Sequence, residues 1–300
     1  MRTSGPLLCL ASGAAFGAMG VFGKLAYAAG STVGTLLAVR FAIAAVVFWT
    51  IVIAAGWARG LPRRDAIAGL GLGAGAYTLQ AGAYFAALER IDASLLALLV
   101  FIFPALVAAA AVALGRERLD RKRVAALALA TGGLVLVVAG AGTGALEPLG
   151  AGLGLTAAVI YAAYILISDR IVGRIAPMVL AALVCTGAAV PLAVGSALLG
   201  ELRPGDLELA GWGWLACLAV VSTVASISLL YAGLRRVGPT TAAILATVEP
   251  LATVLLAFAV FGETLGGVQL AGGALVIAAV LVLNAWPNHE PRRQAAWAET

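Results

Sequence analysis

The sequence predicts an all-α integral membrane protein in which ten transmembrane helices form two inverted five-helix repeats around a central cavity. Two observations carry this prediction. The first is composition: the 300 residues are 63% hydrophobic and 11% charged, with a mean hydropathy of +1.06. So much apolar side chain cannot be buried inside a water-soluble globule. The second observation is an internal duplication.

The duplication is visible as five residues of the first half that map onto identical or similar residues 146 positions later without a gap. Leu88, Ile91, Ser94, Pro104 and Glu117 correspond to Leu234, Val237, Thr240, Pro250 and Glu263. We therefore predict a first repeat over residues 1–141, a Gly-rich link, a second repeat over 147–286 and a cytoplasmic tail over 287–300.

Ten apolar runs are long enough to cross about 30 Å of hydrocarbon as helices. They cover residues 6–28, 32–56, 66–87, 93–114, 124–141, 150–168, 177–199, 211–234, 240–260 and 267–286. Long runs with little strand-like alternation favour helices over a β-barrel. Because each repeat holds five spans, the second must enter the membrane in the opposite sense to the first, as in alternating-access transporters.

The basic residues predict that both termini are cytoplasmic. With that orientation the inner side collects fifteen Lys and Arg residues and the outer side only Lys24, Arg90 and Arg203, as the positive-inside rule requires. This distribution also explains the net charge of +5 without a nucleic-acid partner. The lipid bilayer and a small-molecule substrate are the partners we expect, and the sequence does not predict an oligomeric state.

Three charged residues fall inside predicted spans, where each costs about 2.5–3.5 kcal/mol and needs a compensating role. Lys24 and Arg40 are expected in the outer half of the membrane, where they could line an outer vestibule and meet a substrate carboxylate. Alternatively, Lys24 reaches the outer headgroups and Arg40 binds backbone carbonyls between helices.

Glu249 is expected near the middle of the ninth span, directly before Pro250. Pro250 and its counterpart Pro104 in the fourth span are expected to interrupt their helices, and paired interrupted helices point to the central site of a transporter. Glu249 could take up a proton and couple export to the proton gradient, or it could accept hydrogen bonds between helices without titrating. Its counterpart is the uncharged Phe103.

Polar and aromatic residues at helical spacing predict the rest of a substrate site. The stripes are Tyr77, Gln80 and Tyr84 on the third span, Tyr161, Tyr164 and Ser168 on the sixth, and Ser222 with Ser226 on the eighth. One stripe per helix suggests faces turned to a common cavity, although ordinary packing between helices is the alternative for any single residue. Tyrosine suits a zwitterion, since it offers a hydroxyl donor and a ring face for an ammonium group.

The chain lacks the usual signatures of catalysis and cofactor binding. The one histidine is His289 in the tail, no Cys, His or acidic cluster has metal-ligand spacing, and no Walker motif occurs. We expect no catalytic residue, metal, cofactor or ATP-driven step.

The duplicated motif resembles the drug/metabolite transporter superfamily, and in particular its proteins with two EamA-type repeats. The resemblance rests on residues 88–94, Pro104 and 115–119 in the first repeat, on 231–240, Glu249-Pro250 and 261–265 in the second, and on Lys24, Arg40 and Phe41. It implies a ten-helix basket with a central cavity that exports amino acids or related metabolites across a bacterial inner membrane.

We therefore expect a secondary transporter that exports amino acids or related small organic metabolites by alternating access. Efflux of hydrophobic drugs or import of a sugar is the alternative within transport. An intramembrane enzyme is a further alternative, but none of Lys24, Arg40 and Glu249 has an evident catalytic partner in the sequence. A sensor or assembly scaffold would normally add a soluble domain, for which the short loops leave no room.

Overall fold

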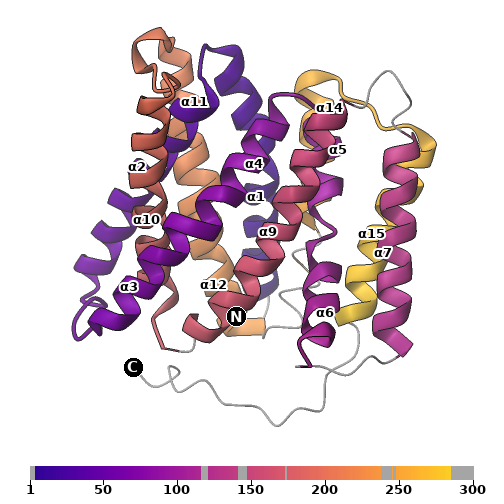
Figure 1. Ribbon diagram of the computed structural model, residues 1–300, viewed down its shortest axis with the longest axis horizontal. Coiled ribbons are helices and arrows are strands. Elements are labelled where there is room, and N and C mark those ends of the chain that lie inside the picture. The colour runs from indigo at the N-terminus through magenta and orange to yellow at the C-terminus, as the bar shows by residue number, and fades with distance from the viewer. Residues whose placement is uncertain are drawn as a thin grey trace.

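The computed structural model describes residues 4–115, 121–140, 147–172, 174–237, 245 and 248–284, and every regular element in these ranges is a helix (Figure 1). The predicted link after residue 141 and the predicted tail at 287–300 lie outside the described residues. Of the first part of the predicted ninth span, 240–247, only Leu245 is described.

Each of the ten predicted spans contains helix in its described part. The first five are α1 (Ser4–Ala28), α2 (Val33–Ala54), α3 (Arg63–Leu72) continuing through η1 (Gly73–Tyr77) into α4 (Thr78–Leu88), α5 (Ala93–Val100) followed by α6 (Phe103–Ala113), and α7 (Arg121–Gly140). The second five are α9 (Pro148–Val172), α10 (Pro177–Leu198), α11 (Leu209–Ala219) continuing through η3 (Val220–Ala225) into α12 (Ser226–Val237), α14 (Val248–Phe261) and α15 (Gly267–Asn284). A short 3-10 turn, η2 (Pro204–Asp206), precedes α11, whereas η1 and η3 are π-helical segments.

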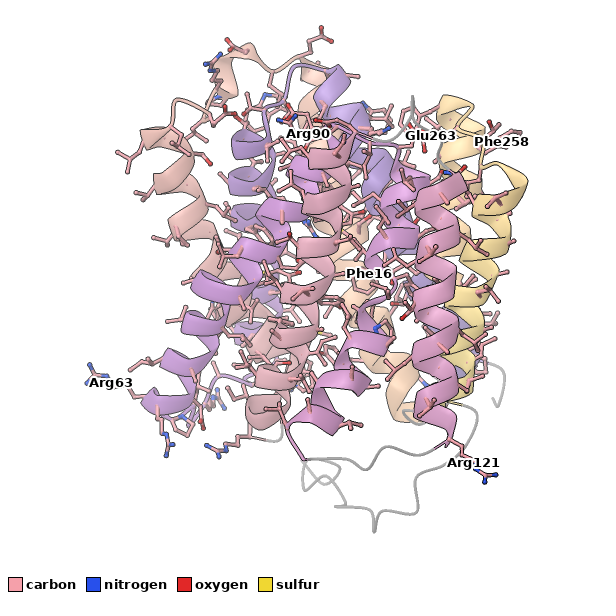
Figure 2. All side chains as sticks on the ribbon, turned by 45° about the vertical axis from the view of Figure 1, so that its right-hand side comes forward. Phe16, Arg63, Arg90, Arg121, Phe258 and Glu263 are labelled. Carbon is pink, nitrogen blue, oxygen red and sulfur yellow. The ribbon has the colours of Figure 1, made fainter. Side chains whose placement is uncertain are left out.

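In the described part of the chain, six helical segments are long and apolar enough to cross a membrane, and three more are apolar but shorter. The six are Gly5–Ala28, Val33–Ala54, Ala93–Ala113, Pro148–Ser168, Pro177–Leu198 and Leu209–Gly233. Large apolar side chains cover the outside of the bundle; Ile53 and Leu255 are each 68% exposed, and Phe258 points outward in Figure 2. Such a surface is suited to lipid rather than to water.

The helices pack mainly across the two repeats. α2 lies along α10 and α7 lies along α15, the latter pair at the right of Figure 1. α1 packs against α12 and α14, while α9, its counterpart in the second repeat, packs against α4 and the α5–α6 segment. Exchanging the repeats therefore maps this set of contacts onto itself, as a pseudo-twofold arrangement requires.

The two repeats run in opposite senses. α14 runs parallel to α1, because Gly13 approaches Val248, Gly17 approaches Thr253 and Lys24 reaches Glu263. The α5–α6 segment, which corresponds to α14, runs the other way: its first residue, Ala93, lies beside Glu263, just beyond the last residue of α14. Figure 2 shows Arg90 and Glu263 at one end of the bundle, here called the Arg90 end, and Arg63 and Arg121 at the other, the Arg63 end.

Small residues allow the closest helix crossings. A Cβ on Gly73 would lie 2.2 Å from the Val184 carbonyl oxygen, and a Cβ on Gly187 would lie 2.2 Å from that of Leu70. The α3–η1 segment and α10 therefore meet through their backbones at two neighbouring glycines, which fixes the third span against the seventh.

Candidate functional site

The bundle encloses a central cavity of about 320 Å³. Its lining comes from both repeats. The first repeat contributes α1, α2, η1, α4, α5 and α6, and the second contributes α9, α12 and α14. Phe16 of α1 is one of the lining residues, and Figure 2 shows it in the interior near mid-height. The cavity thus lies between the two repeats, away from the Arg90 end and the Arg63 end of the bundle.

The lining contains more polar side chains than a packed apolar core would hold. Those with a polar group are Ser12, Arg40, Tyr77, Gln80, Tyr84, Tyr161, Glu249 and Thr253. Six of them, all except Ser12 and Thr253, were predicted from the sequence. Polar groups gathered in a cavity between packed helices are typical of a ligand site in a membrane protein.

Arg40 brings a buried positive charge to the cavity. Its side chain is held by a 3.0 Å hydrogen bond from Nε to Thr223 Oγ1, and its Cζ lies 5.1 Å from the ring centre of Phe41 and 5.2 Å from that of Phe85. The sequence offered two roles for Arg40: lining a substrate vestibule, or binding backbone carbonyls between helices. In the structure Arg40 lines the cavity and also joins two helices, but its partner is a hydroxyl rather than a backbone carbonyl.

Glu249 brings a negative charge to the same cavity. It is the second residue of α14, is partly exposed and stands directly before Pro250, which also lines the cavity. Its carboxylate makes no hydrogen bond or ion pair with any described residue, and within that part of the chain Arg40 and Glu249 are not paired with each other. Among the described residues, the cavity therefore holds a basic and an acidic side chain that do not pair with each other.

Aromatic rings form a chain of contacts, here called the aromatic wall, that ends beside Arg40. Phe103 packs against Tyr161 with ring centres 4.6 Å apart, Tyr161 against Tyr164 at 6.0 Å, and Tyr164 against Tyr77 at 5.2 Å. Tyr77 reaches Phe41 at 5.5 Å, next to Arg40. Tyr164 supports this wall from behind, since it is not part of the cavity lining.

Several predicted site residues lie outside the cavity. Ser222 is fully buried and its hydroxyl has no hydrogen-bond partner among the described residues, while Ser226 Oγ donates to the Thr223 carbonyl at 3.1 Å. Pro104 is in the first turn of α6, just after the interruption at Phe101 and Ile102 that separates α6 from α5.

Lys24 does not line the cavity either. Its Nζ lies 2.8 Å from Glu263 Oε1 and 3.4 Å from Asp92 Oδ1, at the Arg90 end of the bundle.

The sequence did not single out three hydroxyl side chains that shape the site. Ser12 Oγ donates to the Ser226 carbonyl at 2.7 Å, and Thr253 Oγ1 donates to the Gly17 carbonyl at 3.0 Å. The third is Thr223, the partner of Arg40. Single hydroxyls in apolar runs give no pattern that separates them from packing residues, although Ser12 and Phe16 are four residues apart on one helix face.

Within the described ranges, no three His, Cys, Asp or Glu side chains come together as metal ligands would. The groups that face the cavity are instead suited to reversible binding: a cation, an anion, hydroxyls, an amide and aromatic rings.

Comparisons with known proteins agree with this architecture. The model of the EamA-like transporter family matches the chain twice, at residues 3–139 and 148–285. A protein of Archaeoglobus fulgidus, named only as an uncharacterized transporter, is 31% identical over 208 residues, which is 69% of this chain and 72% of its own length.

A second relative, the uncharacterized transporter YcbK of Bacillus subtilis, is 25% identical over 277 residues, covering 90% of this chain and 89% of its own. One solved structure, titled "Crystal structure of protein", shares the fold with a TM-score of 0.64 at 21% identity. The likeness covers 94% of this chain and 97% of that one.

Proposed function

Because the chain belongs to the EamA-like transporter family, with two EamA repeats in one multi-pass membrane protein, we propose that it exports amino acids or related small zwitterions by alternating access. The observation that carries the proposal is the central cavity, in which Arg40 and Glu249 are not paired with each other. Opposite charges in one cavity match the carboxylate and the ammonium group of a zwitterion.

The roles of the side chains follow from their chemistry. Arg40 would bind the substrate carboxylate, since a guanidinium can donate two parallel hydrogen bonds to it. Glu249 and the ring faces of Tyr77 and Tyr161 would receive the ammonium group. Phe16, Met19 and Phe103, which also line the cavity, would contact an apolar side chain.

A neutral hydrophobic drug fits this cavity less well. It would displace water from Arg40 and Glu249 without replacing the hydrogen bonds, and buried charges without partners are costly. Arg40 and Glu249 in one cavity therefore favour a zwitterion over a neutral drug or a sugar.

The test is substrate counterflow in proteoliposomes that contain the purified protein, with a panel of radiolabelled amino acids, one lipophilic cation and one monosaccharide. We expect saturable exchange of at least one amino acid. Arg40→Lys should raise its KM by about tenfold, because the ammonium of lysine cannot donate two parallel bonds. Arg203→Lys, a change at an exposed arginine outside the cavity, is the matched control. If only the cation or only the sugar showed saturable flux, the protein would be a transporter of that substrate class and the proposal of amino-acid export would be wrong.

We also propose that Glu249 carries the proton that couples export to the proton gradient. The proposal is supported by the position of its carboxylate, which lines the cavity without a described partner, beside Pro250. Counterflow should then depend on pH in the native protein and lose that dependence in Glu249→Gln, but not in Glu147→Gln at the surface ion pair with Arg90. An unchanged pH profile in Glu249→Gln rules out this coupling.

The orientation we propose places both termini and the Arg63 end in the cytoplasm of a bacterial cell, with the protein in the plasma membrane. It is supported by the excess of Lys and Arg in the loops assigned to that side. Export then means passage of substrate from the Arg63 end to the Arg90 end.

A further inference from the structure

Two π-helical segments occupy equivalent places in the two repeats. η1 interrupts the third span at Gly73–Tyr77, and η3 interrupts the eighth at Val220–Ala225. Adding the repeat distance of 146 to Gly73 and Tyr77 gives Ala219 and Thr223, so the two segments overlap. Single π-turns inside α-helices often mark functional sites. Here Tyr77 of η1 lines the central cavity, and Thr223 of η3 contacts Arg40, which also lines it.

At each π-segment a threonine hydroxyl donates to a backbone carbonyl of the same span. Thr78 Oγ1 donates to the Gly73 carbonyl at 2.8 Å, and Thr223 Oγ1 donates to the Leu218 carbonyl at 3.1 Å. In both cases the carbonyl is five residues earlier in the chain. The two threonines therefore make the same type of local bond, Thr78 directly after η1 and Thr223 within η3.

The Thr223 hydroxyl has a second partner, whereas that of Thr78 has none among the described residues. Because its hydroxyl proton is directed to Leu218, its oxygen lone pairs remain free, and one accepts the 3.0 Å hydrogen bond from Arg40 Nε. Thr223 is 1% exposed and Arg40 is 3% exposed, so this bond is buried. The bond joins α2 of the first repeat to η3 of the second.

This contact fixes how the guanidinium is presented. Phe41 and Phe85 approach it at 5.1 and 5.2 Å, and Thr223 occupies Nε. The side chain of Arg40 makes no other hydrogen bond to a described residue, so the N–H groups of its two terminal nitrogens remain available. These form the planar fork that binds a carboxylate through two parallel bonds.

We propose that Thr223 is a positioning residue for substrate recognition: it holds the Arg40 guanidinium so that its two terminal nitrogens receive the substrate carboxylate. The proposal rests on the proposed function, in which Arg40 binds that carboxylate. In this proposal η3 of the second repeat provides the hydroxyl that holds Arg40, the carboxylate-binding residue of the first repeat.

Thr223→Val and Thr78→Val make a matched pair for the test. Both remove a hydroxyl that donates to the carbonyl five residues earlier at a π-segment, but only Thr223→Val removes the partner of Arg40. The readout is the KM and maximal rate of counterflow in proteoliposomes for the amino acid that the protein transports fastest, and for its carboxamide, which lacks the carboxylate.

We expect Thr223→Val to raise the KM of the amino acid by about tenfold, as loss of a hydrogen bond to a charged group predicts, with little change for the carboxamide. Thr223→Ser should restore the KM, and Thr78→Val should leave it near the native value. Equal effects of the two valine variants, equal effects on amino acid and carboxamide, or failure of serine to restore the KM would each overturn the proposal.

A second measurement does not depend on transport. Arginine modification by phenylglyoxal can be followed at the peptide that contains Arg40 by mass spectrometry. Loss of the Thr223 hydroxyl should change the modification rate of Arg40 severalfold, whereas Thr78→Val should not. If no amino acid is transported, the proposed function fails, and equal modification rates in the two variants still decide against the positioning role.

Discussion

Glu263 Oε1 accepts a 2.8 Å hydrogen bond from Lys24 Nζ and thereby joins the loop after α14, in the second repeat, to α1 of the first. The same carboxylate accepts from Ala93 N at 3.2 Å, Ser94 N at 3.0 Å and Ser94 Oγ at 2.9 Å. Asp92, the residue before α5, makes no side-chain cap of its own. Glu263 therefore caps α5 from the other repeat and ties three segments together at the Arg90 end.

Glu263→Gln should destabilise the protein. The amide nitrogen of glutamine would face N–H and hydroxyl donors, so at least one bond is lost together with the charge, at a cost of about 1–3 kcal/mol. The measurement is thermal unfolding in detergent, followed by the reaction of the buried free thiols of Cys9 and Cys185 with a fluorogenic maleimide. Asp92→Asn is the control, since Asp92 is 62% exposed and such pairs contribute little. Equal melting temperatures for the two variants would argue against the cap.

Glu263 should also make stability depend on pH. Burial alone opposes ionisation of its carboxyl, but hydrogen bonds from Lys24 and Ser94 outweigh it and lower the pKa of Glu263 below the ordinary value of 4.5. A lowered folded-state pKa contributes stability that is present above 4.5 and is lost as the pH falls through the folded value. The charged groups around it are Lys24 of α1 and, beyond Lys24, Asp92.

The difference in melting temperature between the native protein and Glu263→Gln should therefore be constant near neutral pH and shrink below about pH 4.5. Because both proteins carry the same other carboxyl groups, the contributions of those groups to the pH dependence cancel in this difference. A difference that grows on acidification would contradict the sign of this effect.

This contact illustrates what the sequence could and could not predict. The repeat distance of 146 residues identified Glu263 as part of the duplicated motif, and hydropathy located all ten spans. The partner of Glu263 could not be predicted, because Lys24 is 239 residues away and no local pattern links the two positions. Lys24 was expected to face an outer vestibule or the headgroups, and its ion pair with Glu263 was not anticipated.

The site could be predicted where the helices are regular, and less well where they are not. Tyr77, Gln80 and Tyr84 were found from their spacing and all line the cavity. Ser222 and Ser226 were assigned to a cavity face on the assumption of 3.6 residues per turn, but η3 spans Val220–Ala225 and a π-turn shifts the faces of the residues around it. Nothing in the composition of this stretch indicates a π-helix, so both serines were misplaced and Thr223 was overlooked.

The crossing of the third and seventh spans should be sensitive to a single methyl group. In Gly73→Ala the new Cβ would lie 2.2 Å from the Val184 carbonyl oxygen, so the backbones of η1 and α10 would have to separate. We expect a marked loss of folded protein in detergent and a lower melting temperature. Gly75→Ala is a close control, because it lies in the same π-segment and a Cβ there would meet nothing within 4 Å. Similar stability of the two variants would show that this crossing is not tightly packed.

The inverted arrangement predicts that equivalent residues of the two repeats are exposed on opposite sides of the membrane. Arg90 and Arg236 are separated by the repeat distance of 146. Arg90 is at the same end as Glu263, whereas Arg236 approaches Gly5 near the start of α1, opposite to Lys24. Because Cys9, Cys185 and Cys217 are free thiols, they are first replaced. In intact cells a membrane-impermeant maleimide should then label Arg90→Cys but reach Arg236→Cys only after permeabilisation. Labelling of both from the same side would mean that the repeats are not inverted, and alternating access between them would lose its structural basis.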